Sequence, residues 1–206
     1  MQDPSFLTRD TLFLLALELD VPDLLNLCLT YPRIDDLICQ REDIWLNKLK
    51  PFYNNLEELQ KDVDDFMSRL PNTSIKDIFS LIYSLNVVKQ FLNKINHIHG
   101  DLPLVDLYNL EKLYLTRKQI IEVPRELGNL LNLQELYLCI NKIEEIPKEF
   151  GNLVKLRILN LFNNQIKEIP KELGNLINLQ TLYVDGNVII PEEILNIPGS
   201  RIIGRL

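Results

Sequence analysis

A repeat with a period of 23 residues occupies the second half of the chain and constrains its fold more than any other feature. Each copy begins at a leucine, and these leucines are Leu110, Leu133, Leu156 and Leu179. From that leucine the four copies read LEKLYLTRKQI, LQELYLCINKI, LRILNLFNNQI and LQTLYVDGNVI. Copies at a fixed period of this length are typical of a solenoid, in which each copy buries its apolar face against its neighbours.

Each copy predicts one short strand followed by a turn. Leucines alternate with other residues, so one face of the strand is buried and the other is exposed. The ninth position of the last three copies is an asparagine, at Asn141, Asn164 and Asn187. An asparagine amide both donates and accepts hydrogen bonds, so these side chains are expected to join successive turns in a ladder. Lys118 has no acceptor, so the ladder should begin at Asn141 and the first turn should be looser.

Proline and glycine divide the rest of each copy. The prolines are Pro124, Pro147 and Pro170, and the glycines are Gly128, Gly151 and Gly174. Proline ends the strand because it fixes φ and lacks an N–H, and glycine is expected to let the chain reverse toward the next strand. In the fourth copy Pro191 comes two positions early and no glycine follows in register. We expect the solenoid to close there, with its last core layer covered by Ile194, Ile197, Ile202 and Ile203.

The period and the phrase P-x-E-[LF]-G-N-L-x-x-L resemble the intracellular class of leucine-rich repeats, which occurs in bacteria, plants and large DNA viruses. The resemblance covers about residues 109 to 195. It implies one curved parallel sheet, and it says almost nothing about the identity of a partner.

Residues 7–49 contain three short apolar stretches at helical spacing, separated by cap and turn signals. They resemble the F-box motif, whose pattern runs from Leu-Pro-x-Glu through Leu-Asp-x-x-Asp-Leu-Leu to a closing Trp. The matching positions are Leu7, Asp10, Leu12, Leu19, Asp20, Asp23, Leu24, Leu25, Leu27, Trp45 and Leu49, with Thr8 in place of the usual proline. The resemblance implies binding to a Skp-type adaptor of a cullin ubiquitin ligase through Leu7, Thr8, Leu12, Leu15, Leu24, Leu27 and Trp45.

A second interpretation of these helices is a cap that protects the open edge of the repeat sheet. The two interpretations differ in the burial of four side chains. In a cap, Leu12, Leu15, Leu24 and Trp45 should all be buried, whereas an adaptor-binding motif should leave several of them exposed.

Two further amphipathic helices are predicted between these regions, one over residues 56–70 and one over residues 74–92. Ser74 and Asp77 have the spacing of a capping box at the start of the second helix. The predicted fold class is therefore α+β. It comprises an F-box-like helical motif at 5–50, a helical linker or cap at 51–100, and a leucine-rich-repeat domain at 101–206.

The strand positions between the leucines cannot enter the core, so they form the concave face of the predicted solenoid. The face is rich in tyrosine, phenylalanine and isoleucine, which are typical of interface anchors, and a solvated polar face is the alternative. The predicted target-binding residues are Lys112, Tyr114, Arg117, Glu135, Tyr137, Cys139, Ile140, Ile158, Asn160, Phe162, Tyr183 and Asp185.

Composition and motifs exclude several kinds of partner. Asp plus Glu outnumber Lys plus Arg by 29 to 22, and the basic residues are scattered, so nucleic acid is not expected. The chain starts without the pattern of a signal peptide and has no run of ~18 apolar residues. We therefore expect no membrane partner and an intracellular, cytoplasmic protein, in the host cytoplasm if the source is viral.

Reactive side chains give no sign of catalysis. Cys28, Cys39 and Cys139 have no paired spacing and are expected to be free thiols in a reducing compartment. His97 and His99 have no further ligands beside them, so no metal site is predicted. No phosphate-binding loop or nucleophile motif occurs, so no cofactor and no enzymatic activity are predicted.

Together these features favour a substrate receptor of a cullin-type ubiquitin ligase. Its N-terminal helices would bind the adaptor, and its concave strands would bind an unknown protein target. The alternative is a scaffold or inhibitor outside any ligase, whose N-terminal helices only cap the solenoid.

Overall fold

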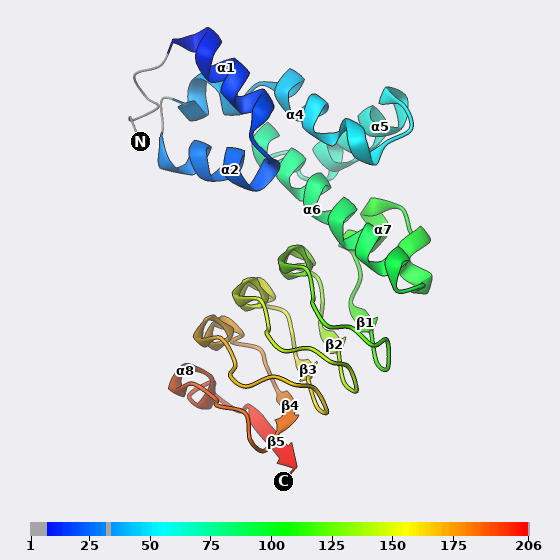
Figure 1. Ribbon diagram of the computed structural model, residues 1–206, viewed down its shortest axis with the longest axis vertical. Coiled ribbons are helices and arrows are strands. Elements are labelled where there is room, and N and C mark those ends of the chain that lie inside the picture. The colour runs from blue at the N-terminus through cyan, green and yellow to red at the C-terminus, as the bar shows by residue number, and fades with distance from the viewer. Residues whose placement is uncertain (1–7, 32–33, 206) are drawn as a thin grey trace. The chain divides into compact units, whose positions relative to one another are not determined.

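The computed structural model describes residues 8–31 and 34–205. The chain divides into two compact units, the first ending at Tyr83 and the second beginning at Ser84, and each is described by itself (Figure 1). The sequence predicts three regions with boundaries at residues 50 and 100. This division differs from the two compact units and stays a prediction. Within the described residues, no helix has both the length and the apolar character that crossing a membrane requires.

The first unit is helical. Its elements are α1 (Arg9–Glu18), α2 (Val21–Thr30), the π-helical turn η2 (Asp35–Cys39), α4 (Glu42–Leu49), the 3-10 turn η3 (Lys50–Phe52), α5 (Leu56–Arg69) and the first part of α6 (Ile75–Lys94). Side-chain caps fix where helices begin. Asp20 Oδ1 accepts from the N–H of Asp23 at 2.8 Å before α2. The predicted capping box is confirmed in its first half: Ser74 Oγ accepts from the N–H of Asp77 at 3.2 Å, and the hydroxyl donates to the carboxylate of Asp77 at 2.6 Å.

The core of the first unit forms around Trp45, which exposes none of its surface. Its indole stacks on Phe79, with 6.4 Å between the ring centroids, and Nε1 donates to the carbonyl of Cys39 at 2.7 Å. The apolar stretch predicted as a third helix is the short turn η2, and the tryptophan belongs to the separate helix α4. The closing Trp of the sequence pattern is therefore a core residue that fixes η2 against α4.

Cys28 and Cys39 form a disulfide, so the prediction that both are free thiols is wrong. Their Cα atoms are 6.1 Å apart, within the usual range, and the bond joins α2 to η2. Pairing depends on how the two elements approach in space, which the spacing of the cysteines does not show. Cys139 is the free thiol among the described residues. The expectation of a reducing compartment loses the support it drew from free thiols.

The second unit contains the rest of α6, the 3-10 turn η4 (Ile98–Asp101), α7 (Leu104–Tyr108) and the repeats. The repeat strands are β1 (Lys112–Tyr114), β2 (Glu135–Tyr137), β3 (Ile158–Asn160), β4 (Thr181–Asp185) and β5 (Arg201–Arg205). The segments between them contain η5 (Arg125–Asn129), η6 (Lys148–Asn152), η7 (Lys171–Asn175) and α8 (Glu192–Leu195). Figure 1 shows successive coils, with the strands along one side and these short helices along the other.

The strands form one parallel sheet in the order β1-β2-β3-β4-β5. The register aligns the buried leucines of the repeats, and Ile202 continues that column beside Leu182. Ile194 and Ile197 are buried, as expected. Ile203 is 42% exposed, so the prediction that it covers the core is wrong. Because β5 is a strand, Ile202 and Ile203 face opposite sides of the sheet.

The asparagine ladder begins at Asn141, as predicted. Its Oδ1 accepts from the N–H groups of Lys118 and Ile120 at 2.9 and 3.1 Å, and its Nδ2 donates to the carbonyls of Leu115 and Leu138, both at 2.8 Å. The first turn is thus held by the asparagine of the following repeat, which supplies the acceptor that Lys118 lacks.

The ladder changes in the fourth repeat. Asn164 bridges the second and third turns in the same way as Asn141, with its Oδ1 accepting from Ile143. Asn187 is exposed and makes no such bridge, contrary to the expected pattern. The carboxylate of Asp185 instead accepts from the N–H groups of Asn163 and Asn164, at 3.1 and 3.2 Å.

The glycines of the repeats are required by close approach. Among the described glycines, only Gly199 has a positive φ, so chain reversal does not explain Gly128 or Gly151. A Cβ atom on Gly128 would overlap the carbonyl oxygen of Glu149, and one on Gly151 would overlap that of Glu172. Each glycine therefore lets one 3-10 turn pack directly on the next.

Residues 84–108 close the first repeat within the second unit. Leu104, Val105 and Leu107 are buried there. The side chain of Asn129, in η5, donates to Ser84 Oγ at 2.9 Å. Helical residues of the second unit thus cover the start of the repeat core.

Candidate functional site on the strand face

The outward positions of the strands come together on one surface, which we call the strand face. Two columns follow from the register of the sheet. They are Lys112, Glu135, Ile158, Thr181 and Arg201, and beside them Tyr114, Tyr137, Asn160, Tyr183 and Ile203. A third set follows β1, β2 and β3 and ends β4, at Thr116, Cys139, Phe162 and Asp185. Each of these side chains is exposed or part-exposed. The structure therefore brings ten of the twelve predicted target-binding residues together.

Two of the aromatic side chains on the strand face stack on each other. The rings of Tyr114 and Tyr137 stack with 4.8 Å between centroids and 10° between planes. Tyr114 is 50% exposed, so half of its surface remains open to solvent in spite of the stacking. Stacked rings held by a strand lose little freedom on binding, which is a property of interface anchors.

At the β1–β2 end of the strand face, the charges of Lys112 and Glu135 neutralise each other. Lys112 Nζ lies 2.8 Å from Glu135 Oε1, and Tyr137 Oη donates to Glu135 Oε2 at 3.1 Å. The hydrogen bond from Lys112 lowers the pKa of Glu135, and the same bond raises the pKa of Lys112. Burial, followed by the bond to Glu135, raises the pKa of Tyr137 to about 12. At neutral pH the group therefore carries no net charge.

Three more of the predicted contact residues have structural partners. Asp185 accepts the two backbone N–H groups in the turn of the third repeat, and Asn160 Oδ1 accepts from the N–H of Phe162 at 3.1 Å. Cys139 Sγ lies 3.2 Å from the hydroxyl of Thr116. These polar groups shape the face, and Phe162 and Ile158 supply apolar surface between them.

Arg117 and Ile140 lie in the turns beside the strand face. We call this edge the rim, which consists of Arg117, Ile140, Asn163 and Gly186. Both predicted residues are exposed, and both have a positive φ, 59° at Arg117 and 57° at Ile140.

Sequence reasoning missed Arg201 and Ile203, which β5 adds to the strand face. Their segment has no leucine pattern and no turn asparagine, so no repeat period reaches it. The available signal was the adjacent pair of β-branched residues Ile202 and Ile203, and so short a segment does not separate a strand from a cap.

The predicted adaptor-binding residues divide between core and surface. Leu12, Leu24 and Trp45 expose none of their surface. Leu15 and Leu27 are part-exposed and Thr8 is exposed, whereas Leu7 lies outside the described residues. Three of the four side chains chosen to distinguish a cap from an adaptor-binding motif are therefore fully buried.

The first unit also holds a group of atoms at metal-ligand spacing. The ligand atoms of Cys28, Asp35 and Cys39 lie within 4.8 Å of one another. The two sulfurs are bonded to each other, and Asp35 Oδ1 is 2.7 Å from Lys76 Nζ. A disulfide provides no thiolate, and the ammonium group already balances the carboxylate, so this group is structural.

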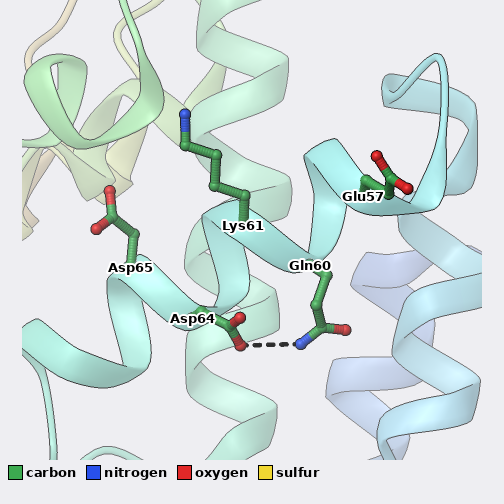
Figure 2. A pocket seen from close by; sticks show the side chains of 5 residues that line it. All are labelled: Glu57, Gln60, Lys61, Asp64 and Asp65. Carbon is green, nitrogen blue, oxygen red and sulfur yellow. Dashed lines mark hydrogen bonds between the residues drawn. The ribbon is translucent and has the colours of Figure 1, made fainter.

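A hollow on α5 is lined by polar side chains from a single helix face. Figure 2 shows Gln60 donating to Asp64, at 3.0 Å, and the other side chains that line the hollow are Glu57, Lys61 and Asp65. The opposite side of α5 buries Leu59, Val63 and Phe66. The hollow is therefore the solvated side of an amphipathic helix.

Comparison with known proteins concerns the repeat region. A family model described as leucine rich repeat matches residues 108–166 and 131–189. A leucine-rich-repeat protein of Leptospira interrogans is 39% identical over 50% of this chain and 28% of its own, with a TM-score of 0.43. An internalin from Listeria monocytogenes is 20% identical over 52% of this chain and 38% of its own, with a TM-score of 0.34. No curated protein matches the chain. The match to the leucine-rich-repeat model thus spans residues 108–189, the part of the chain that forms the repeat strands β1 to β4.

Proposed function

We propose that the chain is a protein-interaction module that holds a protein partner on the strand face. The observation that carries the proposal is the aromatic and apolar surface left in contact with water. Tyr114 stacks on Tyr137 and is still 50% exposed, and Ile203 is 42% exposed. Soluble proteins seldom gather such side chains on one surface unless a partner covers them.

The charge distribution supports contact through apolar groups. Glu135 is neutralised by Lys112, and the carboxylate of Asp185 accepts backbone N–H groups. The centre of the face therefore offers ring faces and aliphatic groups more than unpaired charge. A negative charge placed beside Tyr114 would have to be desolvated on binding, which is costly.

The proposal is tested by selecting binders from a random peptide library on the full chain. The selected peptides are then measured against wild type, Tyr137→Asp and Lys148→Asp, with circular dichroism to show that each variant is folded. Lys148 is exposed in η6, away from the strands, so Lys148→Asp is the matched control. We expect Tyr137→Asp to weaken binding at least about tenfold and Lys148→Asp to leave it unchanged. Equal binding by all three proteins would contradict the proposal.

A second candidate function concerns the first unit. We propose that it binds a Skp-type adaptor, which would make the chain a substrate receptor of a cullin ubiquitin ligase acting by proximity alone. The supporting observation is apolar surface on two helices: Leu14 in α1 is 61% exposed and Leu29 in α2 is 76% exposed. The burial of Leu12, Leu24 and Trp45 restricts adaptor contact to other side chains, and it favours the alternative of a scaffold or inhibitor outside any ligase.

Co-purification with a Skp-type adaptor separates these alternatives. The variants are Leu29→Asp, at an exposed position of α2, and Tyr137→Asp, which serves as the control outside the first unit. If the chain is a ligase receptor, we expect wild type and Tyr137→Asp to co-purify with the adaptor and Leu29→Asp to lose this binding. If wild type does not bind the adaptor, the scaffold or inhibitor remains.

A further inference from the structure

The turns after β1, β2 and β3 each have a left-handed residue at the same repeat position. This residue is Arg117 in the first repeat, Ile140 in the second and Asn163 in the third, with φ of 59°, 57° and 57°. Asparagine tolerates this conformation better than most residues, whereas a β-branched side chain crowds the neighbouring backbone. The third repeat thus has a residue suited to the turn, and the second has one that is strained in it.

Core packing explains the isoleucine only in part. Ile140 is 37% exposed, so more than a third of its surface is left for contact with a partner. The hydrogen bond that fixes its turn is made by the backbone, from the N–H of Ile140 to the carbonyl of Phe162 at 2.9 Å. Any residue except proline makes that bond. Strained residues that stability does not explain are found at binding sites more often than elsewhere.

The neighbouring rim residue supplies a charge. Arg117 is exposed, and its guanidinium forms no ion pair with any residue in the described part of the chain. Neighbouring strands are separated by about 4.8 Å, so the turns of adjacent repeats are close together. The rim therefore presents an unpaired cation beside a branched apolar side chain, at the border of the strand face.

We infer that Ile140 is a contact residue for the partner, and that the partner segment carries an apolar side chain next to a carboxylate. The apolar side chain covers Ile140, and the carboxylate pairs with Arg117 in the planar geometry that guanidinium groups favour. This inference rests on the proposed function, because the rim borders the strand face. The isoleucine is retained for binding, at a cost in stability.

The cost in stability is tested without any ligand. Ile140→Asn places the residue of the third repeat in the second, and Asn163→Ile makes the reverse exchange. Ile140→Asn should raise the melting temperature of the repeat unit by roughly 3 to 6 °C, and Asn163→Ile should lower it by a similar amount. If Ile140→Asn melts at or below the wild-type temperature, strain is not the property that distinguishes Ile140, and the inference is overturned.

The role in binding is tested with peptides selected from the random library on the wild-type chain. Their affinities are measured for Ile140→Asn, Arg117→Gln and Tyr137→Asp, with Lys148→Asp as the control outside the rim and the strand face. We expect at least about a tenfold loss for Ile140→Asn, little change for Lys148→Asp, and selected sequences that place an acidic residue beside an apolar one. With Arg117→Gln as the bait, that acidic preference should disappear.

The outcomes separate the inference from the proposed function. A loss with Tyr137→Asp and none with Ile140→Asn overturns the inference and leaves the strand face as the binding surface. A loss with Ile140→Asn and none with Tyr137→Asp supports the rim and contradicts the proposed strand face.

Discussion

At the residue scale, the side chain of Asn141 holds the first turn of the repeats through four hydrogen bonds to the backbone. Asn141→Ala leaves the N–H groups of Lys118 and Ile120 and two carbonyls without their side-chain partner. We expect it to lower the free energy of unfolding of the repeat unit by about 2 to 4 kcal/mol, measured by urea denaturation. Asn187→Ala is the control, because Asn187 is exposed and outside the ladder, and should cost less than about 0.5 kcal/mol. Similar losses for both would show that the ladder contributes little.

His97 makes the stability of the second unit depend on pH. Its Nε2 lies 2.9 Å from the carbonyl of Tyr114, and its Nδ1 accepts from the N–H of His99. Burial lowers the pKa of His97, and the nearby charges of His99 and Lys118 lower it further, whereas the bond to Tyr114 raises it. Burial also lowers the pKa of His99. The folded state thus binds a proton at His97 less readily than the unfolded state.

The sign of the effect follows from that difference. The stability is fully present above the unfolded pKa of about 6.5 and is lost as pH falls from there through the lower folded pKa. The melting temperature of the repeat unit should therefore fall between about pH 7.5 and pH 5. His97→Asn retains a side-chain acceptor for the N–H of His99 and does not titrate, so its melting temperature should fall less over this range. Parallel curves for the two proteins would exclude His97 as a source of the dependence.

The sequence predicted individual residues well where a period fixed their environment. Asn141 was recognised because its position recurs, and its amide chemistry requires both donors and acceptors. Asp185 could not be recognised from the sequence as a hydrogen-bond acceptor for the turn of the third repeat. Its carboxylate takes the role expected of Asn187, and this is visible only when the fourth repeat is placed beside the third. The strain at Ile140 was equally invisible, because it is a property of φ and not of residue type.

At the element scale, the repeats pack through their 3-10 turns as closely as through their strands. Gly151→Ala places a methyl group against the carbonyl of Glu172, which is backbone and cannot move aside cheaply. We expect a loss of about 2 kcal/mol or more in the free energy of unfolding. Gly204→Ala is the matched control, because its Cβ would meet its nearest atom at 3.5 Å, an ordinary contact. If both variants unfold at the same urea concentration, the turns are not packed as tightly as described.

The disulfide constrains the first unit alone. Cys28 and Cys39 are 11 residues apart, and closing a loop of that size stabilises a fold by roughly 3 kcal/mol. Reduction with a dithiol should lower the melting transition of the first unit and leave that of the second unchanged. Alkylation under native, non-reducing conditions followed by intact mass measurement should modify one cysteine, Cys139. Modification of all three cysteines would show that the bond is absent.

Elements were predicted where apolar spacing was long or repeated. The helices α5 and α6 and the strands β1 to β4 follow from periodicity, because burial of one face needs no information from distant residues. The turn η2 and the strand β5 could not be predicted from periodicity, because both depend on tertiary partners. The pairing of β5 with β4 and the disulfide at Cys39 come from segments that a local pattern does not join.

At the scale of the whole molecule, the α+β class and the repeat solenoid follow from the sequence, whereas the exposure of the N-terminal leucines does not. The F-box resemblance identified Leu12, Leu24 and Trp45 by position, and the structure shows that all three are core residues of the first unit. A motif shared between proteins records which residues recur, and it does not say which of them face solvent. The strand face was easier to predict because alternation in a strand itself separates buried from exposed side chains.

The most direct test of the strand face as a binding surface is one titration series. A peptide selected on the full chain is titrated calorimetrically into wild type, Tyr137→Asp and Lys148→Asp. We predict a dissociation constant at least about tenfold higher for Tyr137→Asp than for the other two, with all three proteins folded. Equal dissociation constants for the three proteins would place the partner elsewhere and contradict the proposed function.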